Sequence, residues 1–294
     1  MRHDPDRVVY VNGDFTPASE ARISVFDRGF LFGDGVYEVS SVIDGKLIDN
    51  AAHLARLDRS MRALEIARPA TDEAILAAQR ELIARNALVE GLVYLQVTRG
   101  AAERDFSFPT DAAPSLVMFT QAKAVVDNPK AETGISVALV PDLRWKRRDI
   151  KTVNLLPASW AKHQAAALGA DDAWMVETDG DGVERITEGS SNNAYIVTAE
   201  GVVVTRQLGT EILHGITRKA VLKLAEEAQI RIEERAFTPE EAKAAVEAFS
   251  TSASGFVMPV VSIDGAPVGD GRPGPIARRL RGLYIEMARA EASG

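Results

Sequence analysis

The order of strand and helix patterns along the chain constrains the fold more than any other feature. These patterns do not alternate regularly over the 294 residues, which argues against a doubly wound parallel sheet. The Asn12-Gly13 pair lies between Val8-Val9-Tyr10-Val11 and Phe15 and predicts a hairpin. The chain is long enough for two domains, each with its own core. The sequence therefore predicts an α+β protein of two domains.

Hydrophobic periodicity and turn residues predict the elements in more detail. Helices are expected around residues 54–64 and 72–88, after Pro157, from Gly215 and over 276–290. Residues 100–114 should form an irregular loop, and the polar stretch 121–133 is the predicted linker. Strands are expected at 36–43, 92–98, 115–120, 135–140, 172–177, 194–198, 202–205 and 248–250.

Composition excludes several classes of function. The net charge of −8 argues against a general nucleic-acid surface, and the lack of cysteine removes thiolate chemistry. No apolar run approaches the ~20 residues of a membrane span, and the first residues lack the apolar core of a signal peptide. The four histidines show no metal-ligand spacing, and there is no P-loop or G-x-S-x-G elbow. We expect a cytoplasmic protein without a metal, nucleic-acid or membrane partner.

A run of cations ends at Lys151. The segment Arg144-Trp145-Lys146-Arg147-Arg148-Asp149-Ile150 precedes it directly. Positive neighbours and partial desolvation disfavour the ammonium form, and a free amine can form a Schiff base with an aldehyde. The alternative is a solvated basic face, which is the commoner use of such a run.

Four other features could complete a site with this lysine. Glu188 lies in Thr187-Glu188-Gly189-Ser190-Ser191. Its carboxylate could face a cationic ring nitrogen; the alternative is a plain polar loop with an incidental glutamate. Gly215-Ile216-Thr217 opens a helix whose amides suit a phosphate. The 250–255 turn adds hydroxyls. Arg56 points away from the apolar face of its helix, so a solvated arginine is the default and a phosphate clamp the alternative.

Together these segments resemble the fold-type IV pyridoxal-phosphate enzymes, most closely the D-amino-acid transaminases. The resemblance covers nearly the whole chain, and its pieces occur in the family's order. It implies a smaller N-terminal α/β domain over 1–125 and a larger, barrel-like cofactor domain over 126–294. The matching pieces are residues 27–39, 53–57, 96–100, 149–151, 187–192, 215–218 and 250–255.

The resemblance also implies roles for individual residues toward pyridoxal 5'-phosphate. Lys151 corresponds to the Schiff-base lysine, and Glu188 to the carboxylate that faces the pyridine nitrogen. The remaining cofactor-binding positions are Arg56, Ser191, Leu213, Ile216, Thr217, Ser252 and Ala253. The substrate-binding positions are Tyr37, Arg104, Phe106 and Ser254. In the family, the arginine that matches Arg104 is contributed by the partner subunit, so a homodimer is expected.

Two positions depart from the family pattern. Phe106 stands where D-amino-acid transaminases commonly have a histidine, so the carboxylate trap lacks one donor. Ala253 stands where relatives often have a threonine. The expected reaction is ping-pong transamination of D-alanine with 2-oxoglutarate. The alternatives are a branched-chain L-amino-acid aminotransferase, an (R)-selective amine transaminase, an aminodeoxychorismate lyase and a non-catalytic cofactor-binding protein.

Overall fold

The computed structural model describes residues 4–293, which divide into two compact units. The first unit comprises residues 4–124, Ile150–Asn154 and 291–293. The second comprises Val125–Asp149 and Leu155–Ala290. Within residues 4–293, no helix is both long enough and apolar enough to span a membrane.

The first unit is built on an antiparallel sheet with the strand order β2-β1-β6-β5-β3-β4. Asn12 and Gly13 join β1 to β2 with positive φ angles of 51° and 113°, so the structure contains the predicted hairpin. The strands are β1 (Val8–Val11), β2 (Asp14–Pro17), β3 (Gly35–Ile43), β4 (Lys46–Ile48), β5 (Gly91–Thr98) and β6 (Ser115–Ala122).

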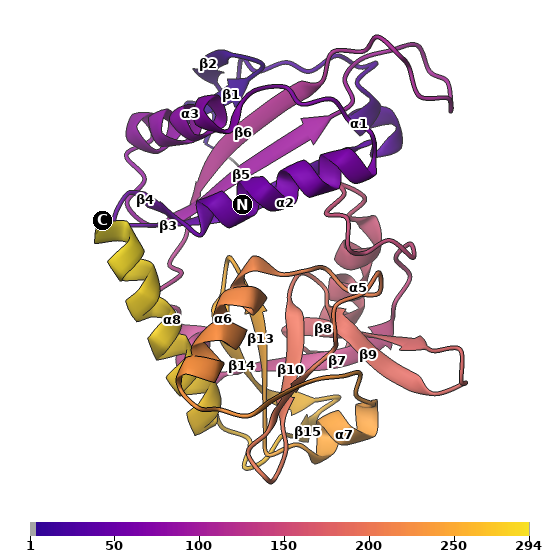
Figure 1. Cartoon of the computed structure of the whole chain (residues 1–294), viewed down its shortest axis with the longest axis vertical. Helices are drawn as coiled ribbons and strands as arrows, with labels where there is room; N and C mark the ends of the chain where they lie inside the picture. The colour runs from indigo at the N-terminus through magenta and orange to yellow at the C-terminus, as the bar shows by residue number, and fades with distance from the viewer. Residues whose placement is uncertain (1–3, 294) are drawn as a thin grey trace. The chain divides into compact units, whose positions relative to one another are not determined.

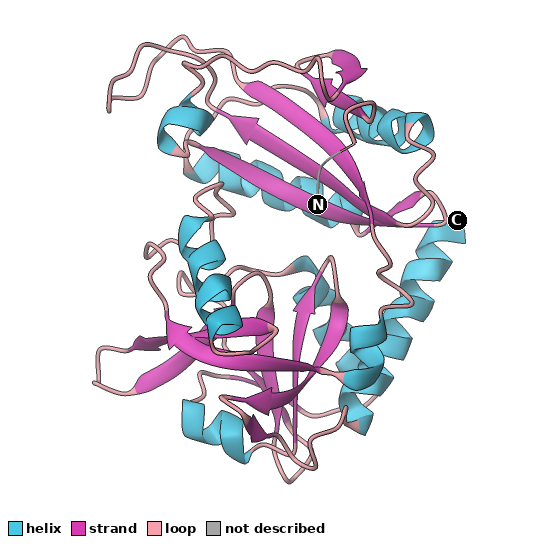
Figure 2. Cartoon of the chain, turned by 180° about the vertical axis from the view of Figure 1, so that it is seen from behind, coloured by secondary structure: helices cyan, strands magenta, loops and turns pink. Residues whose placement is uncertain are grey.

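Helices α2 (Asn50–Ala63) and α3 (Asp72–Arg85) cover one face of this sheet (Figures 1 and 2). Their apolar side chains form a core with the sheet, which includes Leu57 and Leu82 from the helices and Val36 and Leu95 from the strands. Helix α3 ends three residues before the predicted end because Ala87 takes a positive φ of 47°. A short helix, α1 (Arg28–Phe32), was not predicted from the sequence.

The second unit is built on a mixed sheet with the order β12-β11-β10-β13-β14-β7-β8-β9, and β15 pairs with β14. The pairs β7–β8, β7–β14 and β11–β12 are parallel, and the others are antiparallel. Its strands are β7 (Ile135–Pro141), β8 (Asp172–Thr178), β9 (Glu184–Gly189), β10 (Asn193–Val197), β11 (Val203–Thr205), β12 (Ile232–Glu234), β13 (Glu247–Ser252), β14 (Phe256–Ile263) and β15 (Ala266–Pro267).

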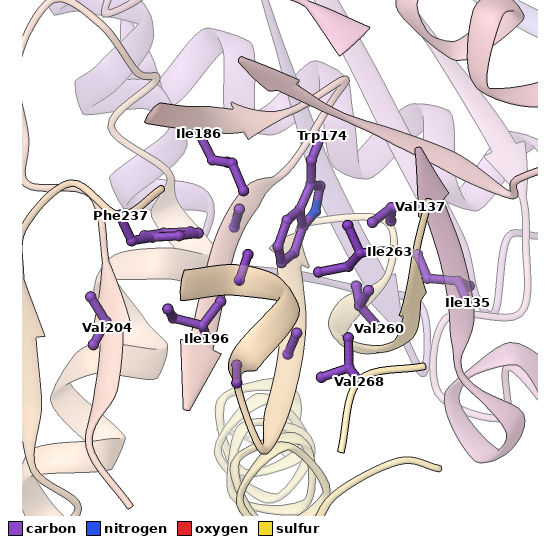
Figure 3. Close-up of a cluster of buried hydrophobic side chains, with 14 of the residues drawn as sticks. Ile135, Val137, Trp174, Ile186, Ile196, Val204, Phe237, Val260, Ile263 and Val268 are labelled. Carbon is purple, nitrogen blue, oxygen red and sulfur yellow. The ribbon is translucent and has the colours of Figure 1, made fainter. Parts of the chain in front are cut away.

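Buried side chains from several strands form the core of the second unit. Figure 3 shows Trp174, Ile186, Ile196 and Phe237 pointing toward one another, and all four are fully buried or nearly so. The helices of this unit are α4 (Pro129–Thr133), α5 (Leu156–Ala167), α6 (Ile216–Glu227), α7 (Pro239–Ala244) and α8 (Pro275–Ser293), of which the last three residues belong to the first unit.

The linker predicted over residues 121–133 is too long. Strand β6 continues to Ala122, and α4 begins at Pro129. The side chain of Asn128 accepts from the Lys130 amide, so the Asn128-Pro129 pair is a helix start and not part of a flexible connection. The sequence prediction also missed β9, which lies beside a charged turn, the short elements β12 and α7, and the eight-residue strand β14.

Candidate active site

Lys151 lies in the segment Ile150–Asn154, which runs beside the first residues of β3. Val36 forms an antiparallel bridge with Thr152, and Tyr37 donates its backbone N–H to the Lys151 carbonyl at 3.0 Å. The Nζ of Lys151 lies 4.2 Å from the centroid of the Tyr37 ring. Two residues that were assigned to one site from the sequence, Lys151 and Tyr37, are therefore in direct contact.

Carboxylates neutralise the cations that precede Lys151, which corrects the argument from cation crowding. Arg148 is not on a solvated face either, because only 1% of its side chain is exposed. In contrast, no ion pair of Lys151 is found within residues 4–293. The pairs are Arg144 with Asp142 and Glu188, Arg148 with Asp142 and Glu177, Lys146 with Glu177, and Arg147 with Asp149.

Glu188 is a buried strand residue and not part of a polar loop. Its Oε1 accepts from Nη1 of Arg144 at 2.5 Å, and its Oε2 accepts from Nδ2 of Asn193 at 2.8 Å. The backbone N–H of Leu213 lies 3.0 and 3.1 Å from the two oxygens. Burial raises the pKa of Glu188, although Arg144 works in the opposite direction. Each oxygen of the carboxylate therefore accepts two hydrogen bonds from the three donors.

Asp142 holds Arg144 in place beside Glu188. Its two oxygens accept from Nε and Nη2 of Arg144 at 3.0 and 2.7 Å, and Oδ2 also accepts from the Thr187 hydroxyl at 2.7 Å. Burial tends to raise the pKa of Asp142, but the hydrogen bonds and charge of Arg144 lower it overall. Asp142, Arg144 and Asn193 had no role predicted from the sequence. A polar Asn193 at the start of the apolar 194–197 run was the only local signal.

Ile216 and Thr217 are the first residues of α6, as predicted. Gly215 is the N-cap, and no side chain of the described residues caps this helix. A Cβ at Gly215 would lie 2.1 Å from Oδ1 of Asn193, so this close approach requires glycine. Uncapped amides and the helix dipole make this end a suitable place for a phosphate group.

The turn between β13 and β14 carries Ser252, Ala253 and Ser254, which are all half-buried. A buried arginine of α8, Arg281, donates from Nη1 to the carbonyls of Gly255 at 2.7 Å and Val257 at 3.0 Å. Arg281 therefore holds the backbone of the turn in place. The sequence had predicted only that it lies on an amphipathic helix.

Arg56 is buried, so the default expectation of a solvated arginine is wrong, and its cofactor-binding role stays a prediction. Its Nε and Nη2 each donate to Glu38 at 2.7 Å, and Nδ1 of His53 lies 2.7 Å from the same carboxylate. Burial tends to raise the pKa of Glu38, but Arg56 and His53 hold it at about 2. The helix pattern placed Arg56 on the side opposite the apolar side chains. It could not show that Glu38 of β3 lies against that side and accepts from the guanidinium.

Arg104 and Phe106 lie in the exposed loop that follows β5. Phe106 is 80% exposed, and its ring centroid is 5.6 Å from that of Phe32. The Cζ of Arg104 lies 5.6 Å from the Phe32 centroid and 5.7 Å from the Phe106 centroid. No carboxylate partner of Arg104 is found among the residues that the structure describes.

Each unit contains one group of the predicted site residues. The first unit contains Tyr37, Arg56, Arg104, Phe106 and Lys151. In the second unit Ser191 is exposed, Leu213 is half-buried and Thr217 is buried. The group in the second unit is Glu188, Ser191, Leu213, Ile216, Thr217, Ser252, Ala253 and Ser254.

Comparisons with known proteins identify the family. The chain is 40% identical over 276 residues to the D-alanine aminotransferase of Staphylococcus aureus strain COL, covering 93% of this chain and 95% of the relative. The D-alanine aminotransferase of Staphylococcus haemolyticus is also 40% identical, over 284 residues, with 95% and 98% covered.

Solved structures agree in fold. A branched-chain amino acid aminotransferase from Escherichia coli superposes with a TM-score of 0.85 at 22% identity, covering 96% of this chain and 94% of the other. The branched-chain aminotransferase of the archaeon Thermoproteus uzoniensis gives 0.83 at 25% identity, with 96% and 94% covered. The predicted fold type and aminotransferase activity are thereby confirmed. Residues 35–263 match the amino-transferase class IV family, and the chain belongs to that family.

Proposed function

We propose that this protein transfers amino groups from D-amino acids, with D-alanine as donor and 2-oxoglutarate as acceptor, in a ping-pong reaction that uses pyridoxal 5'-phosphate. Relatives named D-alanine aminotransferase, at 40% identity over most of the chain, support this choice of substrate. The sequence motifs predict the same activity.

One observation of the structure carries the proposal. The amine of Lys151 has no ion pair within residues 4–293, whereas every other cation of the 144–151 run has one, and it lies against the Tyr37 ring. A lysine without a carboxylate partner can act as a nucleophile and as a base more readily than one held in an ion pair.

The described residues fit the cofactor in their chemistry. In the second unit, the uncapped start of α6 and the Ser252 hydroxyl offer donors that suit a phosphate. In the first unit, Arg56 offers a guanidinium already oriented by Glu38. Glu188 is a buried carboxylate held by Arg144 and Asn193, and it would face the ring nitrogen. When bound, the cofactor would supply an aldehyde carbon and an electron-accepting ring.

The protein side of the reaction then follows from these residues. Lys151 would hold the cofactor covalently until a substrate amine displaces it, and would then move a proton from the substrate Cα. Glu188 would keep a positive charge on the ring nitrogen by accepting its hydrogen bond. Tyr37 and Arg104 would bind the substrate carboxylate, with Arg104 reaching the site of the partner subunit in a homodimer.

A donor panel tests the proposal. D-alanine, L-leucine and (R)-1-phenylethylamine are each supplied with 2-oxoglutarate, and aminodeoxychorismate is supplied alone. D-alanine should be converted with the highest kcat/KM. A higher value for L-leucine would replace the D-amino-acid proposal with the branched-chain alternative, and absence of any turnover would favour a non-catalytic binding protein.

A further inference from the structure

Two arginines share one buried carboxylate in the first unit. Arg28 Nε and Arg99 Nε each donate to Oδ2 of Asp34 at 2.8 Å, and Arg99 Nη2 donates to Oδ1 at 3.1 Å. The exposed fractions of these three side chains are only 2%, 7% and 8% for Arg28, Arg99 and Asp34. The cluster therefore contains two guanidinium charges for one carboxylate, so its remaining donors need other acceptors.

Backbone carbonyls supply those acceptors, and they differ between the two arginines. Arg99 donates to the carbonyls of Leu64 at 2.7 Å and Glu65 at 2.9 Å, just after α2. Arg28 donates from Nη1 to the carbonyl of Asp105 at 2.7 Å, with the Ser107 carbonyl at 3.4 Å. Through the two arginines, Asp34 thus connects the end of α2 to the exposed loop. Within this cluster, only Arg28 donates hydrogen bonds to the loop backbone.

One aromatic ring of α1 and one of the loop itself contact arginines of this region. The Phe32 centroid lies 4.5 Å from Cζ of Arg28 and 5.6 Å from Cζ of Arg104, so the ring contacts both guanidinium groups. The Phe108 ring lies 3.8 Å from Cζ of Arg99.

We propose that Arg28 is a positioning residue for Arg104, acting through the Asp105 carbonyl and the Phe32 ring. This inference rests on the proposed function in one respect, namely that Arg104 binds the substrate carboxylate. Asp105 follows Arg104 directly, so a hydrogen bond to its carbonyl restricts the backbone beside the binding residue. Without that restriction, substrate binding must also order the loop, and the ordering raises KM.

Arg28→Lys tests the proposal because lysine keeps the charge but lacks the planar fork that reaches both Asp34 and the loop. We expect KM for D-alanine to rise about tenfold, the scale of one charged hydrogen bond, with kcat changed less than about twofold. The same substitution in an Arg104→Ala background should leave KM unchanged, since Arg28 would act only through Arg104. Phe32→Leu, which keeps the hydrogen bonds but removes the ring, should raise KM less than Arg28→Lys.

The matched control is Arg7→Lys. Arg7 also donates from Nη1 to a backbone carbonyl, that of Thr120 at 2.8 Å, and its Cζ lies 5.7 Å from the Phe119 centroid. The Arg7→Lys substitution should leave KM for D-alanine unchanged. An unchanged KM in Arg28→Lys, or an increase that persists in the Arg104→Ala background, would overturn the positioning role.

A second readout does not depend on activity. Trypsin cleavage after the exposed Arg104 should become faster in Arg28→Lys than in the wild type or in Arg7→Lys, because the loop is released from its anchor. If Arg104→Ala alone leaves KM unchanged, the carboxylate role of Arg104 is wrong, and the anchor is then judged by proteolysis alone. Equal cleavage rates in the three proteins would overturn the anchor itself.

Discussion

Glu38 holds Arg56 with both of its carboxylate oxygens, at 2.7 Å to Nε and 2.7 Å to Nη2. Both side chains are buried, and His53 completes the group. A bidentate pair fixes the plane of the guanidinium as well as its position. The helix pattern alone suggested a solvated Arg56, but Glu38 of β3 holds its guanidinium in one orientation.

The Glu38 carboxylate should make stability sensitive to acid. Its pKa in the folded protein is about 2, below its ordinary value of 4.5. A lowered folded-state pKa contributes stability that is present above about pH 4.5 and is lost as pH falls toward 2. Glu38→Gln should remove this part of the pH dependence and lower the free energy of unfolding by about 3 kcal/mol at pH 7, because Arg56 stays buried without its partner.

Urea unfolding between pH 3 and pH 7 measures both effects. Glu81→Gln is the control, since Glu81 pairs with Arg85 on the exposed surface of α3 and should change stability by less than about 0.5 kcal/mol. A Glu38→Gln protein as stable as the wild type at pH 7 would show that the buried pair is energetically neutral.

Lys151 should carry the cofactor. Borohydride reduction of the holoenzyme, followed by digestion and mass spectrometry, should find the label on Lys151. Lys151→Ala should lack the label and lose turnover by several orders of magnitude. Lys146→Ala removes a cation that pairs with Glu177, and this variant should keep both the label on Lys151 and the turnover. A label on any other lysine would make the assignment wrong.

Glu188 should influence the rate more than the fold. Glu188→Gln keeps the shape but removes the charge and replaces one acceptor oxygen with an NH2 donor. We expect kcat to fall about 10²-fold or more, the scale of a lost preorganised electrostatic partner. Circular dichroism should show a folded protein. Glu177→Gln is the control, because Glu177 pairs with Arg148 in the same unit. Near-normal turnover of Glu188→Gln would remove this residue from the mechanism.

Arg104 should act across the subunits of a homodimer. Lys151→Ala chains should be inactive, and Arg104→Ala chains should keep only weak activity with a strongly raised KM. After subunit exchange, each heterodimer should regain one site with the KM of the wild type. In that site the intact lysine and the intact arginine come from different chains. Exchange is verified separately with differently tagged chains, and no recovery after verified exchange would mean that each chain completes its own site.

Phe106 should set the strength of carboxylate binding. Its ring is exposed beside Phe32, close to Arg104, and offers no hydrogen bond. Phe106→His would add a donor, so KM for D-alanine should fall several-fold, consistent with ~0.5–1.5 kcal/mol for one net hydrogen bond. A carboxylate-free amine should be little affected. Equal effects on both substrates, or none, would leave Phe106 as a packing residue.

Local patterns predicted much of the fold. The Asn12-Gly13 hairpin, the strands β3, β5 and β6 and the helix that opens after Gly215 all lie where periodicity and turn residues placed them. These elements depend on neighbours a few residues away, so their signals are contained in short windows of sequence. The charged segment before Glu188 had no such pattern, and β9 was missed.

The sequence by itself determined the α+β class, the family motifs and the choice of Lys151 and Glu188. Only the tertiary structure decided how the charges are paired. Arg144 meets Glu188 across 44 positions of sequence, and Arg28 meets the Asp105 carbonyl across 77. Such pairs have no local signature, because a buried charge is stabilised by whichever acceptor the fold brings to it, wherever that acceptor lies in the chain.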